Sequence, residues 1–223
     1  HIKPIRSIWL VPECNLIPKD RVPLAIDKVN YVGEAIAMVI AEDRYVVRDA
    51  LDLIEVDYDE LPSAIHQEDA IKDGAATIFD DVPQNIAFHW KAGEVPDEIF
   101  EKAEVVVKQR FVEQRVVANP METRAAVAQY NPGSRELTIW CTSQNPHIHR
   151  MVYSDALGVP ESKLRIIAPD MGGGFGAKIA TYTEEALVGF AAMQLKQPVK
   201  WIEERQEHFL ATAHGRDQVI YTE

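Results

Sequence analysis

The fold is decided by one stretch, Leu164-Arg165-Ile166-Ile167-Ala168-Pro169-Asp170-Met171-Gly172-Gly173-Gly174-Phe175-Gly176-Ala177-Lys178. Its first residues are rich in β-branched side chains and predict a strand, and the residues after the glycines predict a helix. Because glycine has no Cβ, the chain can take positive φ angles there and bring bare N–H groups close to an anionic or metal-bound group. We therefore expect a ligand on this turn. The alternative is a tight strand-to-helix turn that binds nothing.

The composition limits the classes of protein to consider. The chain has 223 residues, 47% of them hydrophobic, which is enough for a core in one large or two small domains, and we favour two. Its formal net charge of −12 argues against nucleic acid or an anionic membrane as the main partner. Cys14 and Cys141 lack a C-x-x-C spacing, which indicates a reducing compartment rather than a disulfide framework. The sequence shows neither a signal peptide nor a membrane-spanning apolar run, so we expect a cytoplasmic protein.

The first third of the chain reads as a small α/β unit. Strands are predicted at residues 28–31, 35–41 and 54–58, the last from strict alternation of apolar and acidic side chains. Asp43 is the expected N-cap of a helix between the second and third of these strands. Alternation places the acidic residues of the third strand on its solvent face, so we do not interpret them as a catalytic carboxylate set.

The rest of the chain reads as a second domain. Residues 66–96 carry turn signals and prolines and are typical of a linker or crossing segment. A hairpin is predicted at the turn Asn131-Pro132-Gly133-Ser134, and Gly158 is the expected C-terminal glycine of a helix. The other predicted elements are helices at 97–103, 147–157 and 179–195, and strands at 105–117, 125–130, 136–141, 164–168 and 199–202.

One alternative interpretation of the glycine-rich stretch is a dinucleotide-binding turn. Gly172-x-Gly174-x-x-Ala177 fits the glycine fingerprint formally, and Glu203 or Glu204 could then hold a ribose hydroxyl. The match is modest, because Pro169-Asp170 intervenes after the strand and the acidic pair comes later than the fingerprint requires. A phosphate-binding loop of the Walker type is excluded, since Ile179 stands where its Ser or Thr should be.

Several motifs together resemble one family. Asp170–Lys178 resembles the G-G-G-F-G signature of the molybdenum hydroxylases, the group of xanthine dehydrogenase, aldehyde oxidase and aerobic carbon monoxide dehydrogenase. Thr142–Pro146 resembles that family's Thr/Ser-Gln turn, and Asn119–Thr123 resembles a segment ahead of it. Residues 28–37 with 56–62 resemble the family's α/β hammerhead domain. The sequence of residues 198–205 most resembles that of carbon monoxide dehydrogenase-like large chains, and the resemblance runs from about Val22 to Glu223.

The resemblance implies a fold and a domain division. The fold class is α+β, with an α/β hammerhead domain followed by the first part of a molybdopterin-binding domain. We assign residues 1–66 to the hammerhead domain, 67–96 to the linker or crossing segment and 97–223 to part of the molybdopterin-binding domain. Both chain ends look cut from something longer, and we expect the hammerhead domain to lack its beginning.

The resemblance also implies site residues. Gln144 would hydrogen-bond an oxygen ligand of molybdenum or a neighbouring water, a role that suits an amide that does not titrate. The glycine loop would hold the pterin and the oxygen on molybdenum through its backbone, with Phe175 as a wall of the cavity. Lys178 either packs near the cofactor or is solvated. The expected cofactor-binding residues are Gln144, Gly173, Gly174, Phe175, Gly176 and Ala177, and the expected contacts to molybdenum ligands come from Gln144 and Phe175.

The implied chemistry is hydroxylation of an aldehyde or oxidation of carbon monoxide, with water as the oxygen source. Molybdenum would be held by molybdopterin, either as such or as the cytosine dinucleotide, and iron–sulfur and flavin (FAD) subunits would carry the electrons away in an oligomeric assembly. The family's general base lies beyond Glu223, so we expect no catalytic residue in this chain and no activity of the chain alone. Ile179 stands where purine-oxidising members have a glutamate, which argues against xanthine. A ligand-free structural or interaction fragment is the remaining alternative.

Overall fold

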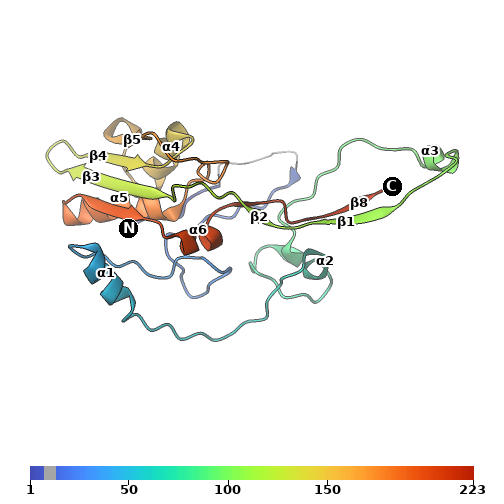
Figure 1. The fold of residues 1–223 in the computed structure, drawn as a ribbon, viewed down its shortest axis with the longest axis horizontal. Coiled ribbons are helices and arrows are strands. Elements are labelled where there is room, and N and C mark those ends of the chain that lie inside the picture. Colours follow the sequence, from blue (N-terminus) through green and yellow to red (C-terminus); the bar gives the residue numbers. More distant parts are fainter. Residues whose placement is uncertain (8–13) are drawn as a thin grey trace.

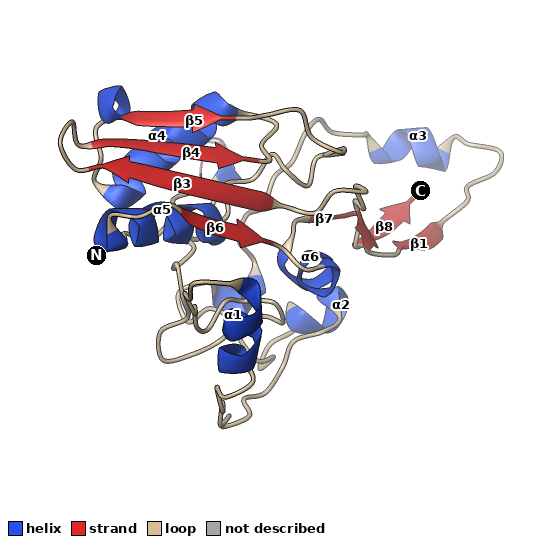
Figure 2. Cartoon of the chain, turned by 60° about the vertical axis from the view of Figure 1, so that its left-hand side comes forward, coloured by secondary structure: helices blue, strands red, loops and turns tan. Residues whose placement is uncertain are grey.

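The main body of the molecule is one mixed sheet with two helices on one face. The computed structural model describes residues 1–7 and 14–223. The four-stranded sheet has the order β5-β4-β3-β6, and α4 and α5 lie together against the same side of it (Figure 2). The elements of this body are β3 (Ala125–Asn131), β4 (Glu136–Cys141), α4 (Pro146–Leu157), the short 3-10 helix η3 (Glu161–Lys163), β5 (Leu164–Ile167), α5 (Thr183–Leu195) and β6 (Val199–Ile202).

The hairpin at the centre of the sheet is set by local sequence. β3 and β4 pair antiparallel, with Ala128 opposite Ile139, and the Asn131 side chain accepts hydrogen bonds from the N–H groups of Gly133 and Ser134 in the turn. Along β4 the apolar side chains alternate, so that Leu137, Ile139 and Cys141 are buried under the helices. The prediction of this hairpin is confirmed.

The two helices close the core over this face. α4 ends where the sequence predicts, because Gly158 takes the left-handed conformation (φ 66°) of a C-terminal glycine. α5 approaches the sheet closely at Gly189, where a Cβ atom would come within 2.9 Å of Ile139 Cδ1. Ile5, near the N-terminus, is 2% exposed and joins the same core, so the first residues of the expected hammerhead domain pack on the second domain.

A thin antiparallel ribbon extends from the body (Figure 1). It pairs β1 (Gln109–Glu113) with β8 (Gln218–Thr222), and β2 (Val116–Val117) with β7 (His214–Gly215). The single strand predicted at 105–117 is therefore wrong in its bounds, because pairing begins only at Gln109 and is interrupted at residues 114–115. α6 (Arg205–Ala211) connects β6 to the ribbon.

The N-terminal region differs most from the prediction. α1 (Arg44–Leu51) is present, and the Asp43 carboxylate caps it by accepting from the N–H groups of Tyr45 and Val46. The strands predicted at 28–31, 35–41 and 54–58 are wrong, since these residues form no strand in the described structure. The physical reason is that an extended segment becomes a strand only beside a partner strand, and no described residues form a strand ladder with these segments. The region also holds α2 (Gln67–Ala70), η2 (Pro83–Asn85) and α3 (Asp97–Glu101).

The strand-helix-strand unit of the dinucleotide interpretation is not formed. β5 and β6 lie at opposite edges of the sheet, separated by β4 and β3, and α5 begins at Thr183 rather than at the predicted residue 179. The glycine loop is therefore not followed directly by a helix.

Candidate functional site

The glycine loop, residues 172–178, lies between β5 and α5 as an irregular turn. Gly173 and Gly176 have positive φ angles of 97° and 91°, and Phe175 between them is also left-handed, with φ 49°. For a phenylalanine such a backbone conformation costs free energy and is found where the surrounding structure fixes it. The expectation of positive φ angles in this loop is confirmed, and a bound ligand there stays a prediction.

Gln144, just before α4, contacts the loop through its side chain and its backbone. Its side-chain oxygen Oε1 accepts hydrogen bonds from the N–H groups of Gly176 (3.1 Å) and Lys178 (3.2 Å). The backbone N–H of Gln144 donates to the Lys178 carbonyl at 3.0 Å. Both side-chain contacts come from donors, so the carboxamide oxygen has to face them and its NH₂ group has to face the other way. Gln144 is therefore held as a hydrogen-bond donor with a fixed direction.

The closeness of Gln144 to the loop requires a glycine at position 174. A Cβ atom on Gly174 would lie 2.6 Å from both Cδ and Oε1 of Gln144. No side chain other than hydrogen fits there without moving the carboxamide. The structure thus brings Gln144 and Gly174 into contact, although thirty positions of sequence separate them.

Three successive backbone donors in this loop have no protein partner. In the described part of the chain, the N–H groups of Gly173, Gly174 and Phe175 make no hydrogen bond to protein atoms. The N–H of Ala177 is used within the turn, where it donates to the Gly174 carbonyl at 2.9 Å, and that of Gly176 is used by Gln144. Of the five loop residues expected to bind the cofactor, 173–177, only the first three therefore have an N–H group without a partner among the described residues.

A buried acceptor beside the loop is also without a partner. The side-chain oxygen Oδ1 of Asn145 is buried and accepts no hydrogen bond within the described residues. A buried polar atom left unsatisfied costs free energy unless a ligand or water completes it. That oxygen is enclosed by protein atoms, so it does not face a ligand on the loop. The free N–H donors and the directed NH₂ group of Gln144 fit a polar ligand with several acceptor atoms, as a pterin has.

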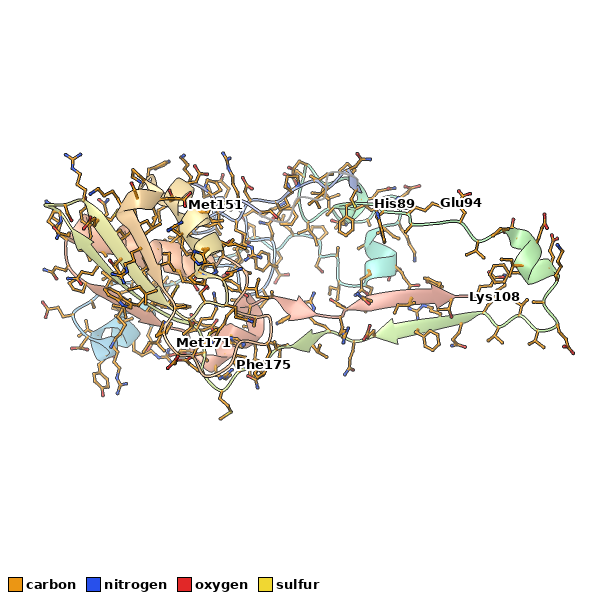
Figure 3. All side chains as sticks on the ribbon, turned by 90° about the horizontal axis from the view of Figure 1, so that it is seen from above. His89, Glu94, Lys108, Met151, Met171 and Phe175 are labelled. Atoms are coloured by element: carbon orange, nitrogen blue, oxygen red, sulfur yellow. The ribbon has the colours of Figure 1, made fainter. Side chains whose placement is uncertain are left out.

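The side chain of Phe175 is largely exposed, and its ring lies over Gly173, where an added Cβ atom would come within 2.9 Å of Phe175 Cε2. It is 75% exposed, and Figure 3 shows Phe175 and Met171 at the margin of the body. Met121 is even more exposed, at 92%. The expectation that Phe175 forms a cavity wall stays a prediction, because the described residues contribute only one side of such a cavity.

Sequence reasoning missed Glu122 as a residue of this site. Its carboxylate oxygen Oε2 accepts from the Gly172 N–H at 2.7 Å and lies 3.4 Å from the Lys178 ammonium. The Lys178 side chain is fully buried, so the expectation that it is solvated is wrong, while packing near the cofactor stays a prediction. The only sequence signal for Glu122 was its place in the segment Asn119–Thr123, which the resemblance singled out without a role.

A buried ionic cluster supports the segment before β3. The Arg124 guanidinium is inaccessible to solvent and pairs with Glu203 (2.6 Å) and Glu184 (2.8 Å), while the ring of Tyr182 stacks on it at 3.9 Å. Glu203 also pairs with His208 at 2.8 Å. Glu203 is therefore occupied inside the protein and is not free for a ribose, which removes one anchor of the dinucleotide interpretation.

Other titratable side chains near the site are inert. Burial raises the pKa of the Cys141 thiol, so a thiolate nucleophile is not formed at neutral pH. Burial lowers the pKa of His149 to about 4, and its ring lies 3.4 Å from the Ile179 carbonyl. In the described ranges no group of three or more His, Cys, Asp or Glu side chains is placed to hold a metal ion. Nor does any described helix have the length and apolar character to cross a bilayer.

Comparison with known protein families gives two matches that together cover most of the chain. The family described as "Molybdopterin cofactor-binding domain" matches residues 78–223. The family described as "Aldehyde oxidase and xanthine dehydrogenase, a/b hammerhead domain" matches residues 10–62. Their order along the chain is the order that the resemblance implied.

Individual relatives and solved structures agree with these matches. The carbon monoxide dehydrogenase large chain of Hydrogenophaga pseudoflava is 38% identical over 97% of this chain and 28% of its own length. The nicotine 6-hydroxylase large subunit of Paenarthrobacter nicotinovorans is 39% identical over 88% of this chain and 24% of its own length. The crystal structure of quinoline 2-oxidoreductase from Pseudomonas putida 86 has a TM-score of 0.87 at 34% identity, covering 98% of this chain and 28% of that one.

The fold and the family matches define the class as a molybdopterin cofactor-binding domain of mixed α/β structure. The chain belongs to the molybdopterin cofactor-binding domain family, with a hammerhead segment of the aldehyde oxidase and xanthine dehydrogenase type before it. It spans about 28% of the length of the carbon monoxide dehydrogenase large chain that it matches.

Proposed function

We propose that this chain forms one wall of the molybdenum-cofactor site in the large subunit of a hydroxylase or dehydrogenase that takes its oxygen from water. The observation that carries the proposal is the row of free N–H groups at Gly173, Gly174 and Phe175 beside the fixed carboxamide of Gln144. The cofactor, when bound, supplies the two-electron redox chemistry and an activated oxygen from water.

The residues of this chain would act by binding and orienting. The NH₂ group of Gln144 would donate a hydrogen bond toward an oxygen atom next to the metal, and the free backbone donors would bind pterin or oxygen acceptors without any reorganisation. Phe175 would cover the cofactor with an apolar surface and help to exclude water. No described residue is placed as a general base, and we assign that role to the part of the subunit beyond Glu223.

The proposed substrates are an aldehyde or carbon monoxide. Ile179 follows the loop lysine where purine-oxidising members have a glutamate, so the polar anchor for a purine is missing. A second candidate is hydroxylation of a nitrogen heteroaromatic ring. It is favoured by the 39% identity to a nicotine 6-hydroxylase large subunit and by the fold likeness to a quinoline 2-oxidoreductase.

The remaining parts of the proposal concern organisation. We propose a hammerhead domain at 1–66, a linker at 67–96 and part of the molybdopterin domain at 97–223. We propose that the pterin carries a cytosine nucleotide, that iron–sulfur and FAD subunits accept the electrons, and that the assembly is cytoplasmic. Relatives named as large chains or large subunits support the expectation of further subunits.

The test is to purify the complete enzyme that contains this sequence from its native host. We expect molybdenum and a fluorescent pterin in equal amounts, and ¹⁸O from labelled water in the product of one substrate among aldehydes, carbon monoxide and N-heteroaromatics. Bound nicotinamide or flavin dinucleotide on the large chain, with no molybdenum, would overturn the proposal. Turnover by residues 1–223 alone would contradict the expected inactivity of the isolated chain.

A further inference from the structure

We propose that Glu122 is a positioning residue that holds both ends of the glycine loop in the binding conformation, with Lys178 as its buried counter-charge. The inference rests on the proposed function, because it assigns to Glu122 a part in retaining the cofactor. It adds a residue that lies some fifty positions away from the loop in the sequence.

At the first end of the loop, Gly172 makes two hydrogen bonds to Glu122. The Gly172 N–H donates to Glu122 Oε2 at 2.7 Å, and the Glu122 N–H donates to the Gly172 carbonyl at 3.2 Å. A Cβ atom on Gly172 would lie only 2.7 Å from the Cβ of Glu122, so this approach requires glycine. A hydrogen bond from an N–H group to a carboxylate is among the stronger kinds.

The second end of the loop is held by the same oxygen atom. The Lys178 ammonium lies 3.4 Å from Glu122 Oε2, and its side chain has no solvent-accessible surface. This is the one ion pair that Lys178 makes within the described residues. A buried ammonium needs a counter-charge, so the carboxylate of Glu122 fixes where Lys178, and with it the end of the loop, can lie.

Glu122 is itself held in place from below. The Arg205 guanidinium, at the start of α6, donates to the carbonyl oxygens of Pro120 (2.8 Å) and Met121 (2.9 Å). Thr123 on the other side donates its hydroxyl to the Glu203 carbonyl at 2.8 Å. The residues on both sides of Glu122 are thus tied to β6 and α6, and the carboxylate is presented to the loop from a fixed backbone.

The free donors lie between the two anchored ends. Gly173, Gly174 and Phe175 have no protein partner, while Glu122 binds the residues before and after them and Gln144 binds Gly176 and Lys178. Losing the carboxylate releases the Gly172 N–H and leaves a buried cation without its partner. The loop then samples other conformations, and its free N–H groups no longer converge on one ligand.

The experiment uses the complete enzyme with Glu122→Ala, Lys178→Met, the double variant, and Glu161→Gln as control. Glu161 pairs with Arg150 on the surface at 3.2 Å, far from the loop. For Glu122→Ala we expect about tenfold faster hydrogen exchange in the peptide spanning 171–178 and about tenfold lower retention of molybdenum and pterin during dialysis. The control should match the parent enzyme in both.

The double variant separates positioning from charge balance. Removing the ammonium as well restores the melting temperature, because no uncompensated charge stays buried, but the Gly172 N–H still lacks its acceptor. We expect fast exchange and poor cofactor retention to persist in it. Recovery of both in the double variant, or parent-like exchange and retention in Glu122→Ala, would overturn the proposal. If the parent enzyme holds no molybdenum, the proposed function fails, and the exchange measurement still decides whether Glu122 orders the loop.

Discussion

At the scale of single residues, the contact between Gln144 and Gly174 is the most sensitive point of the site. In Gly174→Ala the new methyl group would come within 2.6 Å of the Gln144 carboxamide. We expect the side chain of Gln144 to be displaced and its hydrogen bonds to Gly176 and Lys178 to be lost, with about tenfold weaker cofactor retention.

Molybdenum content after dialysis of the complete enzyme measures this effect. Gly215→Ala is a matched control, because the nearest atom to a Cβ there is a flexible Val116 methyl group at 3.7 Å. Equal molybdenum content in the two variants would show that Gly174 is not needed for the fit.

Glu185 gives the core a pH-dependent stability. Burial raises the pKa of this carboxyl group to about 7, and the nearby Tyr153 hydroxyl donates to it at 3.3 Å. Between pH 4.5 and 7 the folded state therefore binds more protons than the unfolded state, and this group lowers the free energy of unfolding as the pH rises. Above pH 7 the loss is complete.

Glu185→Gln removes this titration and keeps an acceptor for Tyr153. We expect the free energy of unfolding of the variant, minus that of the parent chain, to increase by on the order of 2 kcal/mol from pH 5 to pH 8. Urea unfolding at the two pH values measures the difference, with Glu98→Gln on α3 as control. A gap that narrows as the pH rises would contradict the assignment of the raised pKa.

The resemblance could predict Gln144 and the glycine loop because each is a local motif. It could not predict the roles of Glu122 or Arg124, because their partners lie far along the chain. Glu122 meets Gly172, and Arg124 meets Glu203, only after the sheet and α6 have formed. Nor could it predict that the Gly176 N–H donates to the Gln144 side chain. That contact depends on the left-handed backbone at Phe175.

At the scale of elements, Arg124 joins β3, α5 and the end of β6. Arg124→Met leaves the buried Glu203 without its guanidinium, and we expect a loss of about 3–5 kcal/mol in the free energy of unfolding. Arg150→Met breaks the exposed pair with Glu161 and should cost less than about 1 kcal/mol. Denaturant titration compares the two variants, and similar losses would mean that the cluster adds nothing beyond a surface pair.

Elements were predictable where their information is local. The hairpin at Asn131 is fixed by its turn. The start of α1 is fixed by its N-cap Asp43, and the end of α4 is fixed by its C-terminal glycine, Gly158. α5 starts four residues later than predicted. Residues 179–182 make non-helical contacts instead, among them the hydrogen bond from the Tyr182 hydroxyl to the Ala177 carbonyl at 2.6 Å. The alternating pattern at 54–58, by contrast, is compatible with a strand but does not specify which other segment would pair with it.

At the scale of the whole molecule, the chain has one well-packed half and one open half. The buried core gathers around β3, β4 and α5, with Ile5 added from the N-terminus. The apolar side chains of residues 35–41 and 54–58 are instead half exposed, among them Ile40 at 42% and Val56 at 44%. Extended segments with unpaired backbone groups and exposed apolar side chains are suited to receive further strands.

This contrast predicts two classes of backbone protection in the 223-residue chain. Amides at 35–41 and 54–60 have no ladder partners among the described residues, so they should exchange at least about a hundredfold faster than those at 126–129 and 137–141. In the complete large subunit, we expect the first two segments to become protected as added strands pair with them, while the sheet amides stay unchanged. Mass-resolved hydrogen exchange on both proteins measures this. Equally slow exchange in all four segments of the short chain would mean that residues 35–41 and 54–60 fold without further strands, and that their extended, unpaired form is not the one in solution.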